Sequence, residues 1–357
     1  MNSAANFRRF SSRRVVAASL LTAAAVLLAA CGDGDNSAGD SGTNNASSAG
    51  ERRGTPPATE QAVGLPIDAP RIQVISTGSG ERVVMAYDDV DTEQAVDIEV
   101  TEGFEQLVMR NDQLVTEAPA ASQGPDDSEV VTTTLPVTGS VLVPEGFDEA
   151  TPGANSARHV DFRVRDPKIS DAGLAEQIST ADGFGFGWLA ESTGQLNTLL
   201  LAAPQQAGDE ARAIVEQSIT KLVSVPVIFP EEAVGVGAQW SVDSRVTGES
   251  TMLQTTNYEI TEFDGDIVRL DISIEQRPAL GALSLEGHAG AEGFADDTLN
   301  VTSANTRSSG SLTVDLGKPL PVDGELDYTT RVVYGNDGGE ASVVQDSSTR
   351  LRFSSAH

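Results

Sequence analysis

Apolar and polar residues alternate in four separate segments of the chain, and no other feature constrains the fold as strongly. The alternating segments are 96–101, 160–165, 268–275 and 312–317. A period of two places the apolar side chains on one face of a strand and the polar ones on the other. This pattern is typical of antiparallel sheets with one buried and one solvated face. The sequence therefore predicts a mainly β (α+β) fold, built as a curved antiparallel β meander.

Turn motifs between such segments agree with a meander. Asp264-Gly265 and the cluster at 336–339 each separate two strand-like runs, which is a hairpin signal. Thr193-Gly194 is expected to turn segment 184–191 back along 196–201. Because short loops join neighbouring strands, we expect most strands to follow one another in space.

Segment 209–223 has a helical period instead. Asp209 is its predicted N-cap, and Lys221 stands in its last turn, where the helix dipole favours a cation. Apolar residues recur at three- and four-residue spacing, namely Ala211, Ile214, Val215, Ile219, Leu222 and Val223. We predict one amphipathic helix whose apolar stripe packs on the sheet.

This helix divides the predicted β-rich domain, 71–357, into halves of about 71–206 and 224–357. The sequence Leu-Pro-Val-x-Gly occurs once in each half, at 135–139 and at 320–324, where it is expected to form a turn beside a strand. Two interpretations stay open, a duplicated pair of similar halves and a chance similarity. Whether the halves form one sheet or two is also open.

The first 30 residues have the layout of a secretory signal peptide. The segment holds four arginines and no acidic residue, and 15–30 is apolar apart from Ser19 and Thr22. This run is shorter than the roughly 20 residues that a membrane-spanning helix needs, so a permanent span is the weaker alternative. The general secretory route and the twin-arginine route both remain open for export.

Leu28-Ala29-Ala30-Cys31 contains the single cysteine of the chain and resembles the lipobox of bacterial lipoproteins. In that family the cysteine is lipidated, and cleavage makes it the N-terminal residue. The resemblance implies a protein anchored through Cys31 to the extracytoplasmic face of the cell membrane, since two acyl chains anchor stably. Residues 31–70 are rich in Gly, Ser, Asn and Pro, and we predict that they form a disordered tether.

The charge of the chain excludes one class of partner. Its formal charge is -30, and loss of the four arginines in residues 1–30 would make it -34. Such a surface repels nucleic acid, so none is expected as a partner. The expected partners are the membrane, through the lipid anchor, and a lipid, a hydrophobic small molecule or envelope proteins.

No motif for catalysis, metal binding or a cofactor stands out. His159, His288 and His357 are isolated and lack ligand spacing. Segment 183–188, Gly-Phe-Gly-Phe-Gly-Trp, lacks the helix start of a nucleotide loop, and a strand whose glycines let another chain or a ligand approach is the better interpretation. The acidic pairs at 88–89, 126–127, 231–232 and 296–297 are expected to be solvated loop charges. We therefore predict that the chain is not an enzyme.

Segment 234–240, Val-Gly-Val-Gly-Ala-Gln-Trp, is similar to a turn in uncharacterised actinobacterial secreted lipoproteins. Its glycines suit a tight turn or bulge, and Trp240 suits a core anchor. No activity is assigned to that family.

A curved sheet with one helix also resembles, at the level of fold, the lipid-carrier lipoproteins of cell envelopes. The leading hypothesis is a membrane-anchored protein that binds a hydrophobic ligand or a partner; the alternatives are a scaffold without a ligand and, third, a hydrolase.

Overall fold

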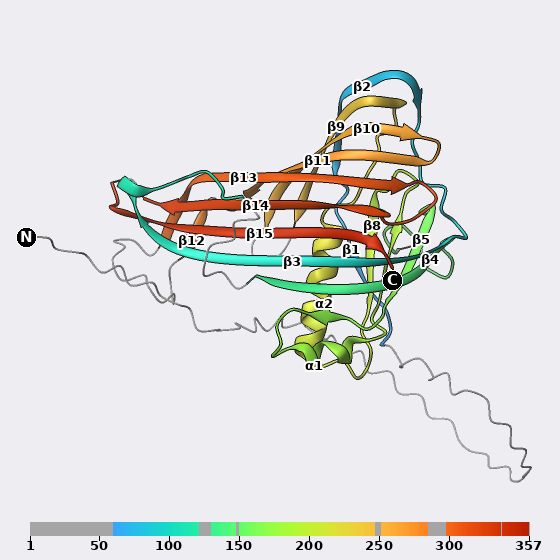
Figure 1. The fold of residues 1–357 in the computed structure, drawn as a ribbon, viewed down its shortest axis with the longest axis horizontal. Helices are drawn as coiled ribbons and strands as arrows, with labels where there is room; N and C mark the ends of the chain where they lie inside the picture. Colours follow the sequence, from blue (N-terminus) through green and yellow to red (C-terminus); the bar gives the residue numbers. More distant parts are fainter. Residues whose placement is uncertain are drawn as a thin grey trace, which may run out of the picture. The chain divides into compact units, whose positions relative to one another are not determined.

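The computed structural model describes residues 60–120, 130–147, 150–246, 251–284, 298–336 and 338–356. These residues form a single fifteen-stranded antiparallel sheet, which confirms the predicted mainly β class and places both predicted halves in one sheet (Figure 1). Two α-helices, α1 (Ala175–Ile178) and α2 (Asp209–Val223), and two short 3₁₀ segments at 111–113 and 179–181 accompany the sheet in this part of the chain.

The strands are β1 (Val63–Pro66), β2 (Arg71–Val83), β3 (Glu93–Arg110), β4 (Val131–Leu142), β5 (Arg158–Val164), β6 (Lys168–Ile169), β7 (Gly185–Ala190), β8 (Leu196–Ala202), β9 (Val234–Val246), β10 (Met252–Asp264), β11 (Ile267–Pro278), β12 (Ala282–Ser284), β13 (Thr298–Asp315), β14 (Asp323–Gly335) and β15 (Ala341–Ser355). Their order across the sheet is β1-β8-β7-β5-β4-β3-β15-β14-β13-β11-β10-β9-β2, with β12 on β13 and β6 on β4. Most neighbours are hairpin partners, as expected. The pairs β1–β8, β3–β15 and β2–β9 are not, because their strands lie far apart in the sequence.

The sheet is curled until its two edges nearly meet. Strand β1 is one edge and β2 is the other, yet only residues 67–70 connect them. A connection of this length spans at most about 18 Å. Twelve strand spacings laid flat would cover about 58 Å. The curvature therefore encloses one face of the sheet, and the main core fills that face.

Helix α2 covers this enclosed face and has the predicted bounds. The buried side chains of its stripe, Ala211, Val215, Ile219 and Leu222, join a core that includes residues of every strand from β2 to β15 except β12. The helix starts differently from the prediction. Gly208 is the N-cap and makes no side-chain capping bond, while Asp209 belongs to the first turn, where its charge still suits the helix dipole.

Two predicted boundaries are corrected by the strands. Residues 63–66 form β1 and pair with 198–201 of β8, so the folded body begins inside the predicted tether of 31–70. The sequence at 135–139 forms no turn and lies within β4. Pro136 fits there because β4 changes its neighbour from β6 to β5 at this point, so the missing N–H breaks no ladder bond. Its counterpart at 320–324 leads into β14, whose first two residues are Asp323 and Gly324.

Candidate functional site

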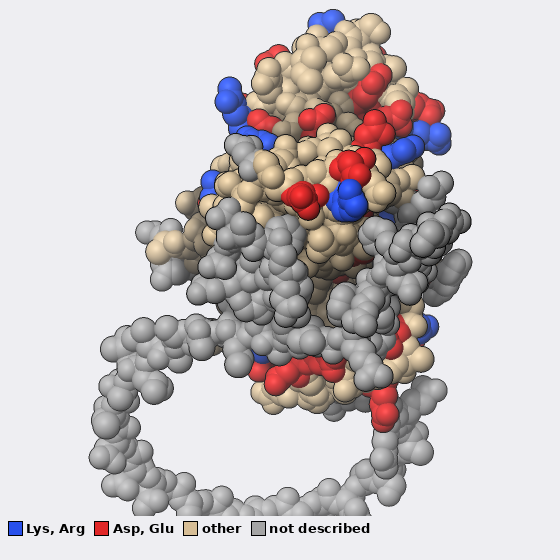
Figure 2. Space-filling view, turned by 90° about the vertical axis from the view of Figure 1, so that its left-hand side faces the viewer, with Lys and Arg blue, Asp and Glu red and all other residues tan. Residues whose placement is uncertain are grey.

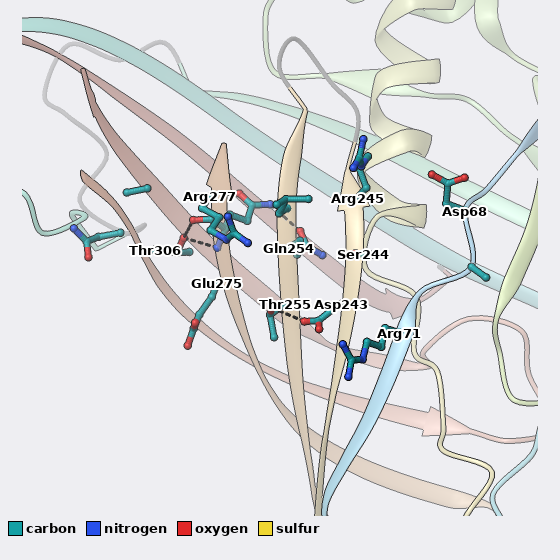
Figure 3. A pocket seen from close by; sticks show the side chains of 15 residues that line it. Asp68, Arg71, Asp243, Ser244, Arg245, Gln254, Thr255, Glu275, Arg277 and Thr306 are labelled. Carbon is teal, nitrogen blue, oxygen red and sulfur yellow. Dashed lines mark hydrogen bonds between the residues drawn. The ribbon is translucent and has the colours of Figure 1, made fainter. Parts of the chain in front are cut away.

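A groove of about 810 Å³ crosses the ends of β9, β10 and β11 and reaches residues 304–306 of β13, beside residues 68–71 (Figure 3). The side chains of Trp240, Gln254 and Tyr258 contact the end of α2 or the segment after it. Because side chains alternate along a strand, the even-numbered residues face the helix and the odd-numbered ones point away from it. The exposed side chains of the groove that argue for a function are Asp68, Arg71, Asp243, Arg245, Glu275 and Arg277.

Register places these charges in two rows. Arg71 lies opposite Asp243, and Thr255 lies between Asp243 and Glu275. The Thr255 hydroxyl donates to the Asp243 carboxylate at 2.7 Å (Figure 3). In the second row, Leu253 lies opposite both Arg245 and Arg277, so the two guanidinium groups flank an apolar side chain.

The three arginines of the groove have no ion pair and no side-chain hydrogen bond with any residue that the structure describes. Several other arginines do have them: Arg158, Arg212 and Arg331 are each held by carboxylates. A free guanidinium offers five N–H donors in a planar fork that matches carboxylates and phosphates. The groove therefore holds unused donors in a chain that is strongly acidic overall.

The cavity beside the helix on the enclosed face is small. A cavity of about 40 Å³ lies at the end of α2, lined by Leu222, Trp188 and Phe353 among others. Small-molecule sites measure about 300–1,000 Å³, so this cavity has room for a few water molecules and not for a lipid chain. Within the described core, the apolar strand positions and the helix stripe pack on each other.

Farther along the strands, the enclosed face becomes polar. Gln254 donates to the carbonyl of Ser224 at the end of α2, at 2.9 Å, and accepts from Gln276 at 2.7 Å. Thr330 donates to Gln276 at 2.9 Å and pairs with Thr306 at 3.0 Å. These hydrogen bonds satisfy the four side chains, so we assign them a structural role, although Gln254, Gln276 and Thr306 also line the groove.

Of the predicted site residues, His159 lies on β5 and is half-buried. Burial lowers its pKa, against the opposing charge of Asp161. Its ring meets Phe147 edge-on at 5.1 Å, and its side chain has no hydrogen bond to a serine or carboxylate of the described chain. His288, His357 and Cys31, the predicted lipidation site, lie outside the described residues.

The acidic pairs behave in two ways. Glu231 and Glu232 are exposed, as predicted for solvated charges. Asp89 is instead fully buried and paired with Arg158, which the sequence did not indicate. The pairs at 126–127 and 296–297 lie outside the described residues. No group of three or more potential metal ligands occurs within the described ranges.

On the face shown in Figure 2, acidic and basic side chains lie next to one another over the upper part of the molecule. No helix among the described residues is long and apolar enough to cross a membrane. The residue ranges 1–30 and 31–59, which carry the predicted signal peptide and most of the tether, lie outside the description.

Sequence reasoning named no ligand-binding residue, and it missed the groove. Arg245 and Arg277 stand on the solvent side of alternating strands, where an arginine is ordinary. Their position on either side of Leu253 depends on register across three strands. Comparison of the sequence with models of known protein families and with curated proteins finds no match.

Proposed function

We propose that this chain is a non-enzymatic protein anchored through a lipid on Cys31 to the extracytoplasmic face of the cell membrane, where it binds another envelope protein. One observation carries the binding part. The cavity at the end of α2 measures about 40 Å³, whereas an open groove of about 810 Å³ is lined in part by charged side chains. A binding surface of this kind suits a scaffold better than a lipid carrier.

The chemistry of the groove favours a protein partner over a small anion. Arg71, Arg245 and Arg277 would bind carboxylates of the partner. Asp68, Asp243 and Glu275 lie in the same groove and would repel a compact anion while pairing with lysines or arginines. Complementary patterns of positive and negative charge on two proteins select the correct partner and set the rate of association.

Reversing two of the groove charges should abolish this binding. A photo-reactive amino acid in place of Thr255, in cells that express the full chain, is expected to cross-link to one envelope protein. Arg245→Glu with Arg277→Glu should remove at least nine-tenths of the adduct, because each change replaces a donor fork by a repelling carboxylate. The matched control is Arg307→Glu, an exposed arginine on β13 that does not line the groove.

Two outcomes would contradict the groove as the binding site. One is the absence of any defined adduct in the otherwise unchanged chain. The other is an adduct that the double reversal leaves intact or that Arg307→Glu weakens equally.

The anchor has a separate test. Cys31→Ala removes the thiol that would carry the lipid, and a chain without acyl groups loses stable membrane attachment. We expect the full-length variant to move from the membrane fraction to the soluble extracytoplasmic fraction, and mass spectrometry to find no acyl mass on it. A variant that stays in the membrane fraction would argue for a retained apolar span.

A hydrophobic ligand is the second candidate, and the helix-side face beyond α2 favours it. Phe104 is 52% exposed and Val108 is 55% exposed on this face. Organic extraction of the protein, purified without detergent, distinguishes the two candidates. A stoichiometric lipid in the extract would support a carrier, and an empty folded protein would support the scaffold.

A further inference from the structure

The far half of β3 has a neighbour on one side only. Strand β15 pairs with β3 from Val96 to Arg110, whereas β4 pairs with it only from Glu93 to Glu102. Figure 1 shows β3 running well past the start of β4. Among the residues that the structure describes, 103–110 is therefore an edge strand within a sheet whose neighbouring parts are paired on both sides.

Hydrogen bonds at the two strand ends show which backbone groups are free. The Asn111 N–H donates to the Glu340 carbonyl at 3.0 Å, so odd-numbered residues of β3 bond to β15. Thr132 of β4 bonds to Ser170 on its far side, so the residues of β4 that face β3 are odd-numbered and pair with even-numbered residues of β3.

Backbone bonds alternate in direction along an antiparallel strand. Beyond Glu102, the N–H and C=O groups of Phe104, Gln106, Val108 and Arg110 therefore point to the free edge. Each of these four residues keeps one unpaired donor and one unpaired acceptor within the described chain. An unpaired edge of this length is a template for another strand.

Two of the usual protections of an edge strand, a proline and a β-bulge, are missing from 103–110. Phe104 and Val108 are more than half exposed on the helix-side face, and Leu107 is 38% exposed on the other face. Glu105 and Arg110 give the stretch a net charge of zero, unlike the acidic chain as a whole.

We propose that this edge pairs antiparallel with the same edge of a second copy, about a two-fold axis at Leu107. The four residues with free groups, 104 to 110, are symmetric about residue 107. In this register Phe104 lies opposite Arg110, and Gln106 lies opposite Val108. All unpaired N–H and C=O groups of both copies then bond to each other, which is the self-complementarity that a two-fold interface requires.

Side chains fit this register as well as the backbone does. Leu107 lies opposite its own copy as a non-hydrogen-bonded pair, the kind in which side chains approach most closely. Phe104 lies opposite Arg110, whose guanidinium pairs with Asp112 of the same chain at 3.1 Å and offers the ring a cation–π partner. Glu105 lies opposite Met109, so no like charges face each other across the new ladder.

A cysteine at the axis tests the register. In the full chain with Cys31→Ala, Leu107→Cys should form an intermolecular disulfide under mild oxidation, because the two Cβ atoms lie about 5 Å apart. Val115→Cys, also exposed, serves as the matched control and should stay reduced. Equal cross-linking of both variants would overturn the proposed register.

A proline at the edge tests the pairing itself. Val108→Pro removes one of the N–H donors at the free edge and leaves the backbone bonds between β3 and β15 in place, because odd-numbered residues make those bonds, so the fold should survive. Sedimentation is expected to show a dimer of the full chain with Cys31→Ala and at least tenfold weaker dimerisation of the proline variant. A monomer at all concentrations, or a dimer that Val108→Pro leaves unchanged, would overturn the proposal. Arg245→Glu with Arg277→Glu should leave the dimer intact. Failure of the proposed dimer and failure of the proposed groove can therefore be distinguished.

Discussion

Asp89→Ala is expected to lower the free energy of unfolding by about 3–5 kcal/mol, because it leaves a buried guanidinium without its counter-charge. Arg158 is 2% exposed and Asp89 is fully buried. The Arg158 Nε donates to one carboxylate oxygen at 2.7 Å, and its Nη2 donates to the other. The guanidinium also lies 4.1 Å from the centre of the Tyr87 ring. Burial in this cluster raises the pKa of Tyr87 strongly.

The pair joins parts of the fold that are distant in sequence. Asp89 belongs to the connection between β2 and β3, and Arg158 begins β5. Urea unfolding of Asp89→Ala, Arg158→Met and the double variant gives a double-mutant cycle. We expect the double variant to be more stable than Asp89→Ala alone, since it removes the buried charge. Additive losses would show that the pair is not coupled, and a loss below about 1 kcal/mol for Asp89→Ala would contradict the expected cost of the unpaired buried charge.

Local patterns predicted the local structure well. The alternation at 268–275 lies in β11, the helical spacing at 209–223 is α2, and Thr193-Gly194 turns β7 onto β8. These features depend on neighbouring residues, so the sequence carries them directly. Strand β1 was missed because its four residues are all exposed and show no buried period. Its place in the sheet comes from pairing with β8.

Contacts between distant residues were beyond prediction. Nothing in the alternation of β3 indicates that its partner is β15, or that β2 crosses to the far edge beside β9. The groove and the edge of β3 both arise from these pairings. Asp89 shows the same limit, because its acidic neighbour suggested a solvated loop and only the fold reveals Arg158 beside it.

Segment 183–188 is a case in which the sequence interpretation was confirmed in part. Its glycines were expected to let another chain or a ligand approach, and the structure shows that a neighbouring strand does so. Gly187 lies on β7 between β5 and β8, opposite Asp161 and Leu200. A Cβ at Gly187 would overlap the carbonyl oxygen of Val160. The contact is with backbone, so no side-chain rotation can relieve it.

Gly187→Ala should therefore destabilise the fold although it adds a single methyl group. Overpacking in a core costs about 1–3 kcal/mol and at times more, and we expect the upper part of that range because β5 would have to move. Gly281→Ala is the matched control, since a Cβ there meets no atom within 4 Å. Urea unfolding should show a large loss for Gly187→Ala and a change within about 0.5 kcal/mol for Gly281→Ala. Equal stability of the two variants would mean that β5 and β7 do not approach as closely as their register requires.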